Sequence, residues 1–267
     1  MSKAPFPFTL VSGGANPKTA LNLVVLSDGY TAGELGRYAT TVSAFVAALH
    51  AEPALNSFSD RINVFRVDVP SEQSGCSRPG GERKTHFRSR SVGDRVITTD
   101  QTIAIKEAGA ALKGLKLRAI VQVNTPEYGG SGGGVAVFSS EVNAPQIAIH
   151  EIGHSEFGLG DEYEDPAAPQ TEKSTANRNI ALGPIVTEPL WLNRLTPPGA
   201  RIFPNPGPGG VLGNDANGVV GLFEGALFHS SGRYRPTATC KMRDLRAPFC
   251  AVCEDLIAEH LSMHYAP

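Results

Sequence analysis

The first half of the chain alternates short apolar runs with amphipathic stretches. Three apolar runs, bounded by polar or turn-forming residues, predict buried strands over residues 22–27, 61–69 and 118–124. Between them, apolar positions recur at helical spacing over residues 34–50 and 100–112 and predict two helices. Thr31 and Glu34 fit a capping box at the start of the first helix. This order of strands and helices predicts an α/β sheet with crossover helices.

A glycine-rich segment, residues 126–134, follows the third predicted strand. It lacks the lysine of a phosphate-binding loop and leads into an apolar run instead of a helix, so it does not predict a nucleotide site. We expect that apolar run, Val135–Ser139, to form an edge strand. Asn143 and Pro145 then fit the first turn of a helix over residues 144–157.

The last third of the chain does not continue the alternation of strands and helices. Residues 196–221 are dense in Pro, Gly and Asn and predict an irregular lobe, whereas residues 249–264 have helical periodicity. We therefore expect two domains. The first, residues 1–163, contains the sheet and the helix over residues 144–157, and the second, residues 164–267, is the smaller C-terminal lobe.

Composition narrows the range of partners. The chain has 267 residues, so it can bury a sizeable core without a metal, and a metal found in it would have a functional role. Lys and Arg number 24 against 26 Asp and Glu, and the resulting charge of −2 does not favour binding to nucleic acid or to an anionic membrane. No apolar run approaches the about 18 residues of a membrane span. The first residues do not show the apolar segment of a secretory signal, which leaves the compartment open.

The motif HEIGH, from His150 to His154, fits the H-E-x-x-H pattern on the predicted helix. Residues four apart lie on one face of a helix, so both imidazoles can reach a single Zn²⁺. Glu151 would then lie beside a zinc-bound water, whose pKa the metal lowers toward about 7. A carboxylate there can take the proton of the water and deliver it to a leaving amine. We therefore predict one catalytic zinc, with His150 and His154 as ligands and Glu151 as the catalytic base.

A catalytic zinc takes three protein ligands and one open position, so a third donor is needed. Asp161 is the leading candidate, because Gly158 and Gly160 precede it and can adopt the positive φ values that turn the chain back toward the metal. Glu162 is the alternative. A third possibility is that Asp161 is a solvated acid within a run of acidic residues.

These residues resemble the zinc-site signature of the immunoglobulin A peptidase family of bacterial zinc metallopeptidases. In that family two histidines and a following Asp-Glu-Tyr occur in the same order. The resemblance covers residues 21–263 and is carried by Leu26–Thr31, Asn124–Gly133, Ile147–Tyr163 and Val220–Met242. A departure is Ser27, where members of the family often have Gly.

The resemblance implies a zincin-like fold. It has a twisted, mostly parallel sheet, an active-site helix, an edge strand beside the substrate cleft and a smaller C-terminal lobe. Val135–Ser139 would be that edge strand, and its free backbone groups could pair with a polypeptide substrate bound in extended form.

Three residues near the C-terminus are further candidates. Met242 resembles the methionine turn beneath the zinc of metzincin-like enzymes, although an ordinary core methionine is the alternative. Tyr234 and Arg235 could stabilise an oxyanion, although a Tyr in a Pro-flanked turn is more often structural.

Three of the four cysteines, Cys240, Cys250 and Cys253, are clustered in sequence. They would supply only part of a structural zinc site, because such a site needs four ligands and the remaining cysteine, Cys76, lies far upstream. We expect a disulfide involving Cys240, or simple burial.

The pattern as a whole predicts a zinc endopeptidase. The alternatives are a binding protein that keeps a zincin scaffold without turnover, and a zinc hydrolase that acts on a non-peptide amide. Glu151 favours an enzyme, because a scaffold kept only for binding needs no carboxylate beside the metal. The natural substrate is open, and the name of the family does not make it immunoglobulin.

Overall fold

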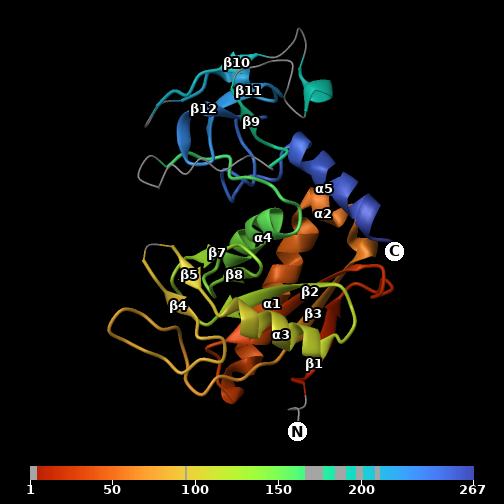
Figure 1. Ribbon diagram of the computed structural model, residues 1–267, viewed down its shortest axis with the longest axis vertical. Helices are drawn as coiled ribbons and strands as arrows, with labels where there is room; N and C mark the ends of the chain where they lie inside the picture. Colours follow the sequence, from red (N-terminus) through yellow and green to blue (C-terminus); the bar gives the residue numbers. More distant parts are fainter. Residues whose placement is uncertain (1–4, 94, 166–176, 184–190, 197–200, 208–210) are drawn as a thin grey trace. The chain divides into compact units, whose positions relative to one another are not determined.

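The computed structural model describes residues 5–93, 95–165, 177–183, 191–196, 201–207 and 211–267. The chain forms two compact units (Figure 1). The first consists of Met1–Glu156 and His260–Pro267, and the second of Phe157–Glu259. The sequence had suggested a boundary after residue 163 and had placed the whole C-terminus in the second domain.

The first unit is built on a six-stranded sheet with the order β1-β3-β2-β6-β8-β7. The strands are β1 (Phe8–Ser12), β2 (Leu21–Asp28), β3 (Ile62–Val67), β6 (Leu117–Val123), β7 (Gly130–Ser131) and β8 (Ala136–Phe138). The four central strands are parallel, while β1 and β7 pair with their neighbours antiparallel. The mostly parallel α/β sheet is therefore confirmed, and β1 is an addition that the apolar pattern did not indicate.

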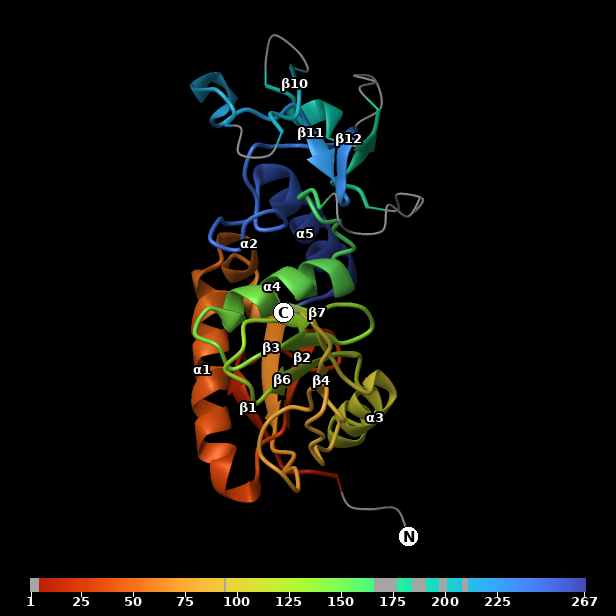
Figure 2. The same ribbon diagram turned by 90° about the vertical axis from the view of Figure 1, so that its left-hand side faces the viewer.

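Helices cover both faces of this sheet. In Figure 2, α1 (Leu35–Ala51) and α3 (Gln101–Ala111) flank the strands on opposite sides. β2 is buried at every position because both of its faces are covered. The predicted capping box is observed at the 3-10 turn that leads into α1, where the Thr31 amide donates to Glu34 Oε2 over 2.9 Å. Asp100 caps α3 by accepting from the Ile103 amide.

The prediction of Val135–Ser139 as an edge strand is wrong. β8 lies between β6 and β7, and its outer side pairs with Gly130 and Ser131. Gly130 in turn bridges to Val96, so a further segment covers this edge. The glycine-rich segment folds back antiparallel to β8 and forms the edge strand itself. The sequence did not predict this strand because a run of small residues has no hydrophobic pattern.

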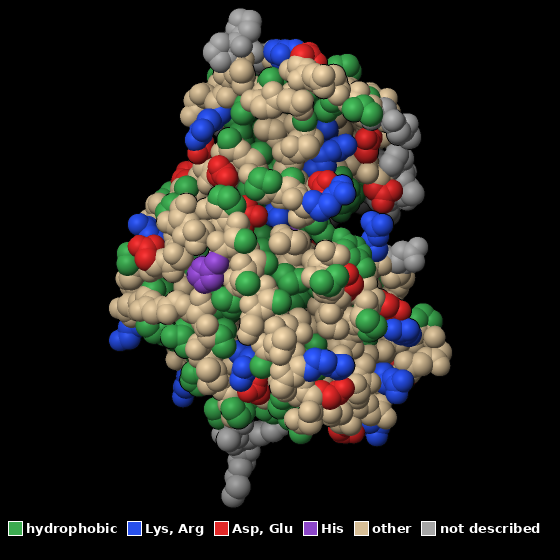
Figure 3. Space-filling model, turned by 180° about the vertical axis from the view of Figure 1, so that it is seen from behind, with side chains coloured by type: hydrophobic (Ala, Val, Ile, Leu, Met, Phe, Trp, Pro, Cys, Tyr) green, Lys and Arg blue, Asp and Glu red, His purple; other side chains and the backbone are tan. Residues whose placement is uncertain are grey.

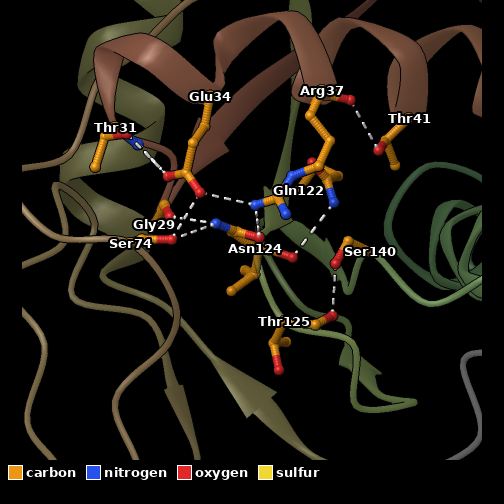
Figure 4. Close-up of polar contacts among 11 residues, drawn as sticks. Gly29, Thr31, Glu34, Arg37, Thr41, Ser74, Gln122, Asn124, Thr125 and Ser140 are labelled. Carbon is orange, nitrogen blue, oxygen red and sulfur yellow. Dashed lines mark hydrogen bonds and ion pairs between the residues drawn. The ribbon is translucent and has the colours of Figure 1, made fainter.

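Polar side chains join the loops at the carboxyl ends of β2 and β6 (Figure 4). Asn124 is the centre: it donates to the Gly29 carbonyl at 2.7 Å and to Ser74, and it accepts from Arg37 at 2.8 Å. Glu34 accepts from both Arg37 and Ser74. Because these groups satisfy one another, the network fixes the start of the segment that continues from Asn124 to the glycine-rich loop.

This network perturbs the carboxyl group of Glu34. Partial burial raises its pKa, but hydrogen bonds from Thr31 and Ser74, together with the charge of Arg37, outweigh that effect. The pKa of Glu34 is therefore lower than its usual value.

The C-terminal residues are fastened to the first unit by Glu156, which is 4% exposed. Its carboxylate accepts from the Tyr265 hydroxyl at 2.6 Å, contacts His260 Nε2 at 2.8 Å and pairs with Arg118. A buried carboxylate with three such partners is compensated for its loss of hydration. The pKa of Tyr265 is raised by burial and by the neighbouring carboxylate.

The second unit is more regular than the predicted irregular lobe. It contains a four-stranded sheet of order β10-β11-β12-β9, with a small core around stacked Phe203 and Phe223. Its strands are β9 (Ala181–Leu182), β10 (Ile202–Phe203), β11 (Leu222–Ala226) and β12 (His229–Arg235). The boundary between the units lies within the final helix, α5 (Ala251–His264), after Glu259.

The remaining elements are short. They are α2 (Pro53–Asn56), β4 (Arg90–Ser91), β5 (Ile97–Thr98) and 3-10 turns at Ala32–Glu34, Ser59–Arg61, Leu192–Arg194 and Asn214–Ala216. Among the described residues, no helix has the length and apolar character needed to cross a membrane. On the face shown in Figure 3, acidic and basic side chains are interspersed.

Candidate active site

The helix α4 (Ala144–Ser155) presents the HEIGH motif. Pro145 lies in its first turn, while the Asn143 side chain binds Glu141 instead of capping the helix. His150 is 8% exposed and His154 is half-buried. Their Nε2 atoms are 3.1 Å apart, and their rings meet edge to face. The structure therefore brings the two predicted histidine ligands together.

The two imidazoles fit a zinc ion. Two nitrogens that each lie about 2.0–2.1 Å from a tetrahedral zinc are separated by about 3.3–3.4 Å. The observed 3.1 Å between the Nε2 atoms is close to that value. Aromatic nitrogen is also a donor that zinc prefers, so both the spacing and the chemistry of the pair suit this metal.

The glycine-rich loop lies directly against Glu151. A Cβ atom placed on Gly132 would be 2.4 Å from Glu151 Oε2 and 3.8 Å from the Cβ of His154. At Gly130, a Cβ would meet the Val137 carbonyl and the Ile147 side chain at about the same separation, 2.5 and 2.6 Å. Only glycine lets this backbone approach the helix so closely. The resemblance links Asn124–Gly133 to the approach to the active-site helix, but no residue of this loop was predicted to be a site residue.

The second unit carries both candidates for the third ligand, Asp161 and Glu162. The backbone bonds around them alternate between two neighbours, as in an extended segment: the Asp161 and Tyr163 carbonyls accept from Leu227 and Phe228, whereas the Glu162 amide donates to Met242. Neighbouring side chains in an extended segment point in opposite directions. Glu162 is fully buried, while Asp161 is half-buried. The assignment of Asp161 as a metal ligand remains a prediction. The Glu162 carboxylate lies in a cluster of cysteines instead.

The glycines before Asp161 have different roles. Gly158 has a φ of +65°, the left-handed conformation expected where the chain leaves a helix. Gly160 does not adopt a positive φ. Its Cβ would instead meet Ile180 and Asn177 at 2.9 and 3.0 Å, so glycine is needed there for close packing.

The Glu162 carboxylate lies among Cys240, Cys250 and Cys253, and all four residues are buried. All the cysteines are free, so the expected disulfide is absent from the described chain and the alternative of burial is observed. Burial raises the pKa of Glu162 to about 8, with the charge of Cys250 adding to the effect. Hydrogen bonds from the other two thiols lower the pKa of Cys250.

The other C-terminal candidates are engaged within the second unit. Arg235 is 2% exposed and donates to the carbonyls of Glu224 and Gly225, and its burial lowers its pKa to about 10. The Tyr234 hydroxyl contacts Glu224 at 3.4 Å. These contacts give both residues a structural role in β12. Met242 is fully buried, and its place beneath a zinc remains a prediction.

The chain matches a known protein family over most of its length. The profile of the IgA peptidase M64 family matches residues 10–187 and 210–261. The chain belongs to this family. Membership confirms the resemblance found in the sequence and makes the protein a peptidase of the metallopeptidase class. None of the curated proteins compared matches the chain.

Proposed function

We propose that this M64 peptidase is a zinc-dependent endopeptidase. The observation that carries the proposal is the 3.1 Å separation of the two Nε2 atoms on α4, with Glu151 held beside them against Gly132. His150, His154 and Asp161 would hold one zinc ion. The metal, when bound, polarises a peptide carbonyl and lowers the pKa of a water molecule.

Glu151 performs the proton transfer. The proposal rests on its position in the motif, between the two histidines, which would leave its carboxylate beside the reacting water and outside the ligand set. It takes a proton as the water attacks the carbonyl carbon and delivers that proton to the departing amine. The backbone around Gly132 limits where this carboxylate can move, so it keeps the base oriented.

A polypeptide in extended form is the proposed substrate. An extended chain exposes its carbonyl groups to a metal and a base, which a helix would hide in its own hydrogen bonds. Because β7 covers β8, the substrate does not pair with Val135–Ser139. No nucleic acid or membrane is part of the proposal.

The experiment is the substitution Glu151→Gln, which keeps the size of the side chain and removes its basicity. We expect kcat on a peptide library to fall by about 10²–10⁴-fold, the range typical of general acid–base catalysis, with zinc content unchanged. The matched control is Glu72→Gln, since the Glu72 side chain is 78% exposed. Activity of Glu151→Gln close to that of the control would refute the role. Loss of zinc would show that Glu151 is a ligand.

A further inference from the structure

A second cluster of metal donors lies wholly within the second unit. Cys240 follows β12, Cys250 precedes α5, Cys253 lies in the first turn of α5, and Glu162 comes from the extended segment. The ligand atoms of these four residues all lie within 4.8 Å of one another. Three separate stretches of the chain thus direct three sulfurs and a carboxylate to one point.

Two distances within the cluster lie close to those of a tetrahedral zinc. Two sulfurs at about 2.3 Å from the metal lie about 3.8 Å apart, and a sulfur and a carboxylate oxygen lie about 3.5–3.7 Å apart. The Sγ atoms of Cys240 and Cys253 are 3.7 Å apart, and Cys253 Sγ is 3.3 Å from Glu162 Oε1. A disulfide would require the sulfurs to be about 2.05 Å apart.

The carboxylate of Glu162 is held in place but incompletely satisfied. Asn179, which is fully buried, donates to Glu162 Oε1 at 3.0 Å and also bonds both backbone groups of Gly160. Glu162 Oε2 is buried and has no hydrogen-bond partner among the residues that the structure describes. A buried carboxylate oxygen without a partner is costly, and a cation at the centre of the cluster would compensate it.

Two features around the sulfurs suit thiolates bound to a metal. The Cys250 amide donates to Cys240 Sγ at 3.3 Å, and Cys250 and Cys253 lie at the N-terminal end of α5, where the helix dipole stabilises negative charge. The spacing of Cys250 and Cys253 is the C-x-x-C of structural zinc sites. Sequence reasoning missed the site because the fourth donor is a glutamate and not a cysteine.

We propose that Cys240, Cys250, Cys253 and Glu162 bind a second, structural Zn²⁺ that joins the start of α5 to the extended segment around Glu162. All four ligand positions are filled by protein, as in structural sites, so no position is left for a substrate. If the proposed function holds, the same ion also fixes the backbone that carries Asp161, the neighbour of Glu162.

The test measures zinc per chain in the full-length protein purified with zinc under reducing conditions. We expect two ions in the unaltered protein and one in Cys253→Ser. The matched control is Cys76→Ser, another buried cysteine that lies in the first unit, and it should retain two. The double substitution His150→Ala, His154→Ala should retain one. A failure of that double variant to lose an ion would count against the proposed function and not against the cysteine site.

Cobalt provides a second readout that identifies the ligands. Co²⁺ added to the metal-free histidine double variant should produce a thiolate-to-cobalt charge-transfer band. Adding Glu162→Gln, which preserves shape and guards against a folding defect, should weaken cobalt affinity by at least about tenfold. The proposal is overturned if no thiolate band forms, if Glu162→Gln leaves the affinity unchanged, if zinc per chain is the same with and without Cys253, or if mass spectrometry finds a disulfide between Cys240 and Cys253 in the purified protein.

Discussion

The close approach of the glycine-rich loop to Glu151 leads to a quantitative prediction for Gly132→Ala. The added Cβ would lie 2.4 Å from Glu151 Oε2, about 1 Å inside an ordinary contact distance of 3.4 Å. The end of a flexible side chain yields more readily than backbone, so the carboxylate should move by about that amount. A displacement of about 1 Å of a catalytic group can cost about 10²-fold in rate, which corresponds to about 2.7 kcal/mol of transition-state stabilisation.

The assay compares kcat/KM for a cleaved library peptide in Gly132→Ala with that in Gly134→Ala. Gly134 is a matched control because a Cβ there would meet the end of Gln101 at 3.0 Å and would not reach Glu151. Thermal unfolding and zinc content should be nearly the same in both variants, because neither glycine has a positive φ. If Gly132→Ala keeps the activity of Gly134→Ala, the loop does not position the base and the argument from its geometry is wrong.

Three further predictions test other parts of the structure. Asp161→Ala should weaken the affinity of the histidine-bound zinc, measured by chelator competition, by more than the about 10–100-fold typical of an outer-shell partner. Glu162→Ala should weaken that affinity much less, by loosening the backbone that carries Asp161, and the opposite order would identify Glu162 as the ligand. Tyr265→Phe removes a hydroxyl that donates to the buried Glu156 and should lower the free energy of unfolding by about 1–3 kcal/mol in urea titrations, and no change would show that this bond is dispensable. The pKa of Glu34 is lower in the folded protein than in the unfolded chain, so its ionised form stabilises the fold above the unfolded pKa of about 4.3 and this contribution is lost as the pH falls through the folded value. The stability advantage of the unaltered protein over Glu34→Gln should therefore shrink on acidification, and an advantage that grows would contradict the direction of the shift.

The sequence alone determined the central elements of the first unit. β2, β3 and β6 are short apolar runs, and α1, α3 and α4 have helical spacing, so a local pattern decides each of them. The HEIGH motif belongs to this class, because the two histidines meet through the geometry of a single helix turn. For the same reason the capping box at Thr31 could be read before the structure.

Tertiary structure decided what depends on partners distant in the chain. Gly130 and Ser131, and not Val135–Ser139, form the edge of the sheet. Backbone pairing sets the order of the strands, and a strand made of small residues has no hydrophobic pattern by which the sequence could predict it. The contact between Gly132 and Glu151 depends on how a loop packs on a helix, and nothing in the spacing of the two residues encodes it.

Asp161 and Glu162, the acidic pair after α4, depend both on local sequence and on tertiary packing. Alternation along an extended segment, a local property, separates the side chains of Asp161 and Glu162. What Glu162 then meets is three cysteines, the nearest of them far along the chain at Cys240 and the others beside the start of α5. The sequence predicts opposite directions for the two acids only where the segment is extended. The packing of distant segments decided both that it is extended and that Glu162 joins a cluster of thiols, because donors that converge in space need share no spacing in the chain.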